Sequence, residues 1–234
     1  MKRLHNIHKI TLFFCSIFLL LFAVTPVQSF ANSDNSDLIM VPFNYNTSDQ
    51  VVTLLNKSGK EVDISGFKIK DGSGNVFEFP ADDSIIIEPF GIIRVHSGPG
   101  IEDEYSSELD FRWTKESIWG EAKIARLADP SGEVIFELDL STTGNKDLLA
   151  GCLTRKEIKM YGFVSCTYCQ AQLDKFENSS RYVNYVECTE NQKICIEERI
   201  MRVPAWVFEE KDKRTIGSMS LGRLYRLAGC NFGP

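Results

Sequence analysis

Between residues 50 and 140, short apolar runs alternate with turn-forming Gly, Asn, Asp and Pro residues. None of these runs extends into the 3.6-residue period of an amphipathic helix. Short strands at this spacing predict an antiparallel β-sandwich, with Trp113 and Trp119 in its core. The expected strands are residues 51–55, 66–69, 76–79, 85–87, 92–95, 123–127 and 134–138.

The last third of the chain has a different pattern, in which apolar strand-like runs alternate with helical ones. This alternation predicts an α/β domain over residues 155–234, after a sandwich over residues 36–140. The polar, glycine-containing start of the intervening segment predicts a linker at residues 141–154. The expected strands are residues 157–163, 182–188 and 205–209, and the expected helices are residues 166–177, 192–201 and 220–227.

The first 31 residues have the order of a secretory signal peptide. Three basic residues precede an apolar stretch at residues 10–24, and small residues follow at Ser29 and Ala31. We expect cleavage near Ala31 and an extracytoplasmic protein, whether periplasmic, on the cell surface or secreted. A retained anchor is the alternative, although the apolar stretch is shorter than the roughly 20 residues that span a membrane.

Charge also divides the chain after this leader. Residues 32–150 hold 22 acidic and 10 basic side chains, a net charge of −12, whereas residues 151–234 hold 10 acidic and 13 basic side chains, a net charge of +3. The difference supports two modules. An acidic first module also argues against nucleic acid as a partner, because binding to the phosphate backbone needs clustered Lys and Arg.

Six of the seven cysteines lie between Cys152 and Cys230, and an exported location favours disulfide chemistry for such a set. Cys166 and Cys169 form a CxxC motif where a predicted strand meets a helix. The helix N-terminus would stabilise a thiolate at Cys166, which we therefore expect to be the nucleophile. Cys169, one helical turn further on and more buried, would resolve the mixed disulfide.

Pro204 comes immediately before the strand expected at residues 205–209. A proline at this position fits the cis-proline loop that faces the CxxC motif in thioredoxin-like folds, where it presents backbone groups to the substrate. A trans proline on an edge strand is the alternative.

An ordered series of short motifs makes the first module recognisable. With these motifs, residues 38–140 resemble a lamin-tail domain. The resemblance implies an immunoglobulin-like sandwich that serves as an accessory module, binding a partner or surface or positioning another domain. The motifs are residues 62–67, 71–75, 79–81, 95–100, 118–119 and 127–132.

Residues 157–230 resemble the thioredoxin-like domain of bacterial vitamin K epoxide reductase homologues. The resemblance implies exchange of electrons between protein thiols or disulfides and a membrane-bound, quinone-linked partner, with no cofactor beyond the redox-active disulfide. The matching motifs are residues 159–162, the CxxC motif, residues 185–188, Cys195, residues 203–206, Gly217, residues 220–221 and residues 228–230.

The remaining cysteines have more than one interpretation. Cys188 and Cys195 are expected to form a structural disulfide, and the resemblance agrees, but a relay of electrons to the CxxC pair is an alternative. Cys152 and Cys230 flank the module and can pair across it. A four-thiolate zinc site is the competing chemistry, although Cx6C spacing of the second pair disfavours it.

Two departures from the resembled families leave the direction of electron flow open. Thr167 and Tyr168 occupy the motif where many relatives have Pro and His, which suggests a less oxidising disulfide. Met160 takes the place of the buried Asp of ordinary thioredoxins, so that proton transfer from Cys169 needs water or another group. The rival function is a non-catalytic binding protein in which the disulfides are purely structural.

Other candidate sites have simpler explanations. Gly72, Ser73 and Gly74 lack the helix and the Lys-Ser/Thr ending of a phosphate loop and are predicted to form a β-turn. His96 has no ligand-like neighbour in sequence and is predicted to be a polar residue at a strand end. With one histidine after the leader, a Ser-His-Asp triad is not expected.

Overall fold

The computed structural model describes residues 37–102, 104–105, 107–119, 123–208 and 213–231. The predicted signal peptide and its cleavage near Ala31 therefore lie outside the described residues. Those that are described belong to one compact unit, Asn32–Pro234. Within them, no helix has the length and apolar character needed to cross a membrane.

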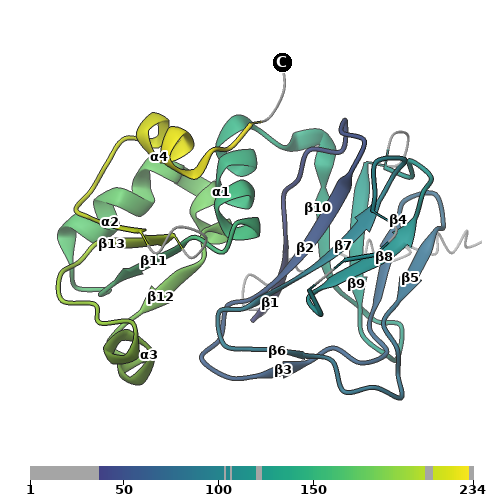
Figure 1. Ribbon diagram of the computed structural model, residues 1–234, viewed down its shortest axis with the longest axis horizontal. Coiled ribbons are helices and arrows are strands. Elements are labelled where there is room, and N and C mark those ends of the chain that lie inside the picture. Colours follow the sequence, from purple (N-terminus) through teal and green to yellow (C-terminus); the bar gives the residue numbers. More distant parts are fainter. Residues whose placement is uncertain (1–36, 103, 106, 120–122, 209–212, 232–234) are drawn as a thin grey trace, which may run out of the picture. The chain divides into compact units, whose positions relative to one another are not determined.

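Two four-stranded sheets and one short two-stranded sheet make up the first module (Figure 1). The first sheet has the order β1 (Leu38–Val41), β2 (Gln50–Asn56), β7 (Ile92–Ser97) and β8 (Asp110–Thr114). The second has the order β10 (Val134–Asp139), β9 (Ile124–Ala128), β4 (Lys68–Asp71) and β5 (Val76–Glu78). The short pair consists of β3 (Val62–Asp63) and β6 (Ile86–Ile87). This arrangement confirms the predicted β-sandwich.

The core of the sandwich contains large apolar side chains with almost no exposed surface. Trp119 is fully buried and makes edge-to-face contacts with Phe43, at 5.4 Å between ring centroids, and with Trp113, at 5.7 Å. Trp113 is itself only partly buried. The prediction of a core position is therefore confirmed for Trp119 and only partly for Trp113.

Three strands of this module were not predicted, namely β1, β3 and β8. In addition, β8 runs parallel to β7, so the expectation of a wholly antiparallel sandwich is wrong at this edge. Parallel neighbours need a long crossover connection, and residues 98–109 provide one here.

A four-stranded mixed sheet forms the centre of the C-terminal module. Its order is β12 (Tyr185–Glu187), β11 (Lys159–Gly162), β13 (Ala205–Phe208) and β14 (Lys213–Ile216). β11 is parallel to β12 and antiparallel to β13. β14 was not predicted because its sequence is polar and mostly exposed. The helices are α2 (Thr167–Leu173), the 3₁₀ segment η2 (Asp174–Tyr182), α3 (Gln192–Glu197) and α4 (Leu221–Ala228).

The two faces of this sheet bury different side chains. Met160 and Trp206 belong to the core cluster that includes Phe176 of η2 and Leu224 of α4. Tyr161, one residue along from Met160, belongs to a smaller cluster that includes Cys195 of α3. The period of two along β11 therefore places α2 and α4 on one side of the sheet and α3 on the other (Figure 1).

The segment predicted as a linker, residues 141–154, largely forms a helix. After a short 3₁₀ turn at Leu140–Thr142, α1 (Asn145–Arg155) buries Leu149, Cys152 and Leu153. The Asp147 carboxylate accepts a hydrogen bond from the Gly144 N–H, 2.8 Å long, at the start of the helix. The linker prediction is wrong because the segment begins with polar residues, which are typical of a linker, and the apolar residues that the helix buries come only after them.

Candidate functional site: the CxxC motif and its surroundings

Cys166 and Cys169 lie at the junction between β11 and α2, and a disulfide joins them. Cys166 is the N-cap residue of α2, and Cys169 lies one turn into the helix, with the two Cα atoms 5.2 Å apart. Cys169 is fully buried, whereas Cys166 is partly exposed. Cys166 is therefore the more accessible of the two bonded cysteines.

Backbone hydrogen bonds shape the turn that carries Cys166. Its N–H donates to the Phe163 carbonyl oxygen at 3.0 Å. Its Sγ accepts a hydrogen bond from the Cys169 N–H at 3.2 Å. A backbone donor directed at Sγ stabilises negative charge on that sulfur when the disulfide is opened.

Pro204 lies next to this turn, and the Val203–Pro204 peptide bond is cis. The register between β11 and β13 pairs Tyr161 with Ala205, which brings Pro204 beside the end of β11 where the CxxC turn begins. The Pro204 carbonyl oxygen accepts a hydrogen bond from the Gly217 N–H, 2.8 Å long, and the proline itself is buried.

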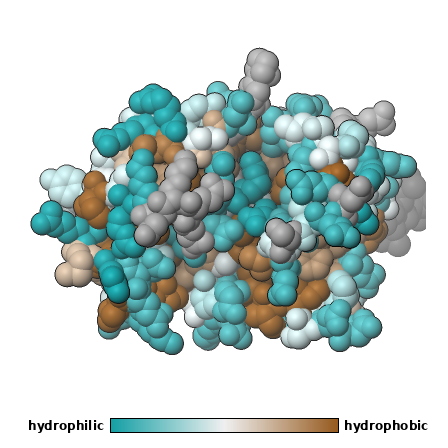
Figure 2. Space-filling view, viewed as in Figure 1, coloured by the Kyte–Doolittle hydropathy of each residue, from teal (hydrophilic) through white to brown (hydrophobic). Residues whose placement is uncertain are grey.

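Apolar side chains flank the CxxC motif at the surface. The exposed fractions are 38% for Phe163, 70% for Val164 and 74% for Tyr168. Most of the molecular face drawn in Figure 2 is hydrophilic, and its hydrophobic residues gather in groups of different sizes. Phe163, Val164 and Tyr168 are thus large apolar side chains exposed next to the CxxC motif.

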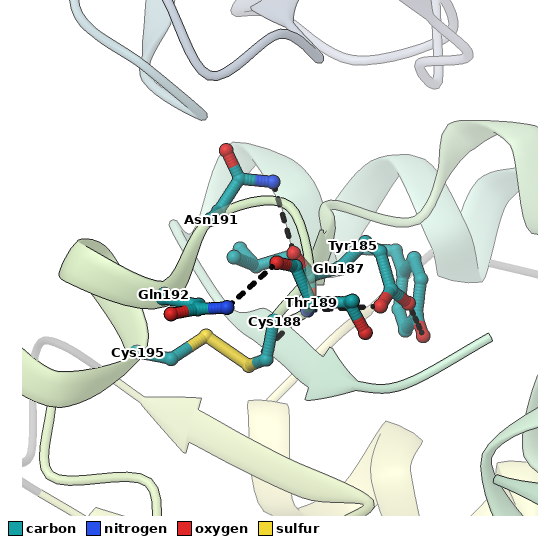
Figure 3. The surroundings of a disulfide bond; sticks show 8 residues. Tyr185, Glu187, Cys188, Thr189, Asn191, Gln192 and Cys195 are labelled. Carbon is teal, nitrogen blue, oxygen red and sulfur yellow. Dashed lines mark hydrogen bonds between the residues drawn. A yellow bond between two sulfur atoms is a disulfide. The ribbon is translucent and has the colours of Figure 1, made fainter. Parts of the chain in front are cut away.

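Met160 is fully buried and offers no proton acceptor below the motif, but its neighbour across the β11–β12 register is Tyr185. The Tyr185 hydroxyl donates to Glu187 Oε2 at 3.0 Å, and the Thr189 N–H donates to Glu187 Oε1 at 3.0 Å (Figure 3). This hydrogen-bonded pair was not predicted from the sequence, where residues 185–188 served only as one of the motifs of the family resemblance.

Both members of this pair have shifted pKa values. Burial raises the pKa of Tyr185, and the hydrogen bond to Glu187 and its charge raise it further. Burial opposes ionisation of Glu187, but hydrogen bonds from Thr189 and Tyr185 outweigh that effect and lower its pKa. At neutral pH a neutral phenol therefore donates to a charged carboxylate.

The other four cysteines form two further disulfides. Cys188 and Cys195 join the end of β12 to α3 (Figure 3), and Cys152 and Cys230 join α1 to the residues after α4. All four are more than nine-tenths buried. Throughout the described part of the chain, no three His, Cys, Asp or Glu residues are grouped to hold a metal ion.

A second cluster of charged groups lies in the sandwich, around His96. Its Nδ1 is 3.0 Å from Asp49 Oδ1, and its Nε2 is 2.9 Å from Asp110 Oδ1. Arg94 Nε donates to the same Asp110 oxygen at 2.6 Å. Burial alone would lower the pKa of His96, but its hydrogen bonds to Asp49 and Asp110 outweigh burial and raise it.

The prediction that His96 is a polar residue at a strand end is confirmed, because it is the last but one residue of β7, but its two carboxylate partners were not predicted. The two carboxylates are 47 and 14 residues away in sequence, and the sheet brings them together. No local spacing reveals such a cluster. Because carboxylates occupy both ring nitrogens, neither nitrogen is available as a metal ligand.

Comparison with known proteins gives a match for the first module. The fold defines that module as an all-β sandwich domain. Residues 31–142 match the family described as Lamin Tail Domain, and the observed sandwich is consistent with its immunoglobulin-like fold. This match ends before the CxxC motif. No curated protein matches the chain.

Proposed function

We propose that this protein is a thiol-disulfide oxidoreductase, and that residues 155–234 form a thioredoxin-like domain with Cys166 and Cys169 as the reactive pair. In this proposal the Cys166 thiolate attacks a disulfide of a protein substrate, and Cys169 resolves the mixed disulfide. The loop that contains Pro204 presents backbone groups to the substrate, and no cofactor other than the disulfide takes part.

The observation that carries the proposal is the unequal exposure of the two bonded cysteines, of which Cys169 is buried and Cys166 partly exposed. A purely structural disulfide has no need of a partly exposed cysteine, and the other two disulfides of the module are buried. The strand order, with β11 parallel to β12 and antiparallel to β13, supports the thioredoxin-like assignment. Phe163, Val164 and Tyr168 would contact the substrate chain.

The wider setting is also part of the proposal. The basic and apolar leader favours an exported protein, and the resemblance of residues 157–230 favours a membrane-bound, quinone-linked partner that recharges the CxxC pair. The lamin-tail-like sandwich would bind a protein or surface and hold the oxidoreductase module near its substrates.

Replacement of the resolving cysteine tests the reaction. In exported Cys169→Ala protein, Cys166 should remain joined to substrates, and non-reducing gels followed by mass spectrometry should identify the mixed disulfides. The Cys166→Ala variant is the matched control and should trap nothing. If Cys169→Ala traps no protein and the wild-type chain neither reduces insulin nor oxidises a reduced test protein, the non-catalytic binding function replaces this proposal.

The direction of electron flow is decided by the reduction potential of the pair. A value near that of thioredoxin, about −270 mV, would assign a reductant, whereas a value near −120 mV would assign an oxidase. Equilibration with glutathione buffers, followed by alkylation and mass spectrometry of the peptide that contains Cys166 and Cys169, gives this potential.

A further inference from the structure

The buried sulfur of the CxxC pair shares a small space with a polar side chain from the neighbouring strand. A methyl group added at Gly162 would lie 3.0 Å from Cys169 Sγ and 2.9 Å from the Tyr185 hydroxyl oxygen. Both atoms therefore border the space above Gly162 that a larger residue would fill. Glycine at this position leaves room for both atoms beside β11.

The strand register explains how the hydroxyl reaches this space. Gly162 of β11 is paired with Glu187 of β12, and Tyr185 lies two residues before Glu187 on the same face of the sheet. Met160, also on that face, is apolar and buried. On this face of the two strands, Tyr185 and Glu187 of β12 supply polar side-chain atoms.

We propose that Tyr185 and Glu187 form the proton relay that serves Cys169. This inference rests on the proposed function and names the groups that carry the proton in its resolving step. Tyr185 donates its own O–H to Glu187, so an oxygen lone pair remains to accept the S–H of Cys169. Glu187, which is ionised, is the final proton acceptor of this relay.

In the mixed disulfide, Cys166 is bonded to a substrate sulfur and Cys169 is a thiol. The Cys169 proton passes to the Tyr185 oxygen as the tyrosine proton passes to Glu187. The Cys169 thiolate then attacks Cys166 Sγ, the bond to the substrate sulfur breaks, and the substrate thiolate leaves with the electron pair and takes a proton from water. The dithiol is oxidised and the substrate disulfide is reduced.

The proton has an exit from Glu187 to solvent. Tyr185 and Glu187 line an open cavity of about 560 Å³ whose other charged lining residues are Asp37, Lys57, Arg181 and Glu190. Because the surroundings lower the pKa of Glu187, a proton received there is released quickly to this water-accessible space.

Stopped-flow reaction of the reduced protein with one equivalent of a dithiobis(nitrobenzoate) disulfide tests the relay. The first release of coloured thiolate reports attack by Cys166, and the second reports resolution by Cys169. We expect Tyr185→Phe and Glu187→Gln to leave the first phase unchanged and to slow the second by about 100-fold near pH 6. The loss should shrink towards pH 9, where water and hydroxide deprotonate Cys169 directly.

Glu190→Gln is the matched control, since it removes one carboxylate from the same cavity without touching Tyr185, and it should resolve at the wild-type rate. Wild-type second-phase rates in both test variants at every pH would overturn the relay and leave the proposed function intact. An equal slowing at all pH values would indicate a purely structural role and would also overturn it. A wild-type protein without a second phase would overturn the proposed function itself.

Discussion

The sandwich and the C-terminal module bury their interiors by different means. The described part of the sandwich contains no cysteine and packs large apolar side chains such as Phe43, Phe79 and Trp119. The C-terminal module contains three disulfides within a shorter stretch of chain. Small domains with limited apolar cores commonly depend on disulfides for stability, and the C-terminal module has this character.

Burial separates the Cys166–Cys169 disulfide from the other two disulfides of the C-terminal module. Cys152, Cys230, Cys188 and Cys195 all have exposed fractions of 7% or less. Cys166 alone among the six bonded cysteines is partly exposed. The comparison therefore predicts large stability losses from the buried bonds of the C-terminal module and from the apolar core of the sandwich.

The largest effect is expected from the disulfide that closes the longest loop. Cys152 and Cys230 are 78 residues apart, and the double substitution Cys152→Ala/Cys230→Ala should lower the free energy of unfolding of the module by about 4.5 kcal/mol, because the unfolded chain regains loop entropy. Urea unfolding followed by circular dichroism measures this loss.

The matched control for that experiment is Cys188→Ala/Cys195→Ala. These residues are 7 apart, so their removal should cost only about 2 to 3 kcal/mol. Equal losses for the two pairs, or a larger loss for the short loop, would show that loop entropy does not govern the stability of this module.

In the sandwich, the largest loss of stability should come from removing a large buried side chain, because this module has no disulfide among its described residues. Trp119→Ala removes a fully buried ring and the hydrogen bond from Trp119 Nε1 to Ser97 Oγ, 3.2 Å long, and should cost about 3 to 5 kcal/mol. Trp113→Ala, at a partly buried ring in contact with the first, is the control and should cost clearly less. Thermal unfolding monitored by calorimetry separates the two, and equal costs would contradict the assignment of Trp119 to the centre of the core.

Much of this architecture follows from local pattern. The alternating apolar runs were enough to predict the sandwich and seven of its strands near their observed positions. Missed elements have specific reasons. β14 is polar, and α1 begins with polar residues that conceal its buried face.

Some features of the candidate site could be predicted from the sequence, and others depend on the fold. The CxxC motif and Pro204 are visible in sequence because short spacing and strand position identify them. The contact of Tyr185 with the space around Cys169 depends on the β11–β12 register and on the missing side chain of Gly162. The His96 cluster depends on β7 and β8 lying side by side. Neither arrangement has a signal in local spacing.

The smallest predicted effect concerns His96, a buried titratable residue of the sandwich. Its folded pKa lies above its ordinary value near 6.5, since Asp49 and Asp110 favour the imidazolium. The stabilisation from the charged form is therefore complete below the unfolded pKa and is lost as the pH rises through the folded pKa. The wild-type advantage over His96→Gln should fall by about 1 to 2 kcal/mol, the scale of a hydrogen bond to a charged group, between roughly pH 5.5 and pH 9.

The carboxylate partner offers an independent check of this pH dependence. Asp49→Asn keeps a side chain of the same shape beside Nδ1 but removes one negative charge, so the slope of stability against pH should become shallower without disappearing, because Asp110 still contacts Nε2. Urea midpoints recorded at each pH for the wild type and both variants supply the three curves. Parallel curves over the whole range would mean that His96 has the same pKa in the folded and unfolded protein, and that its carboxylate contacts contribute packing but no charge-dependent stability.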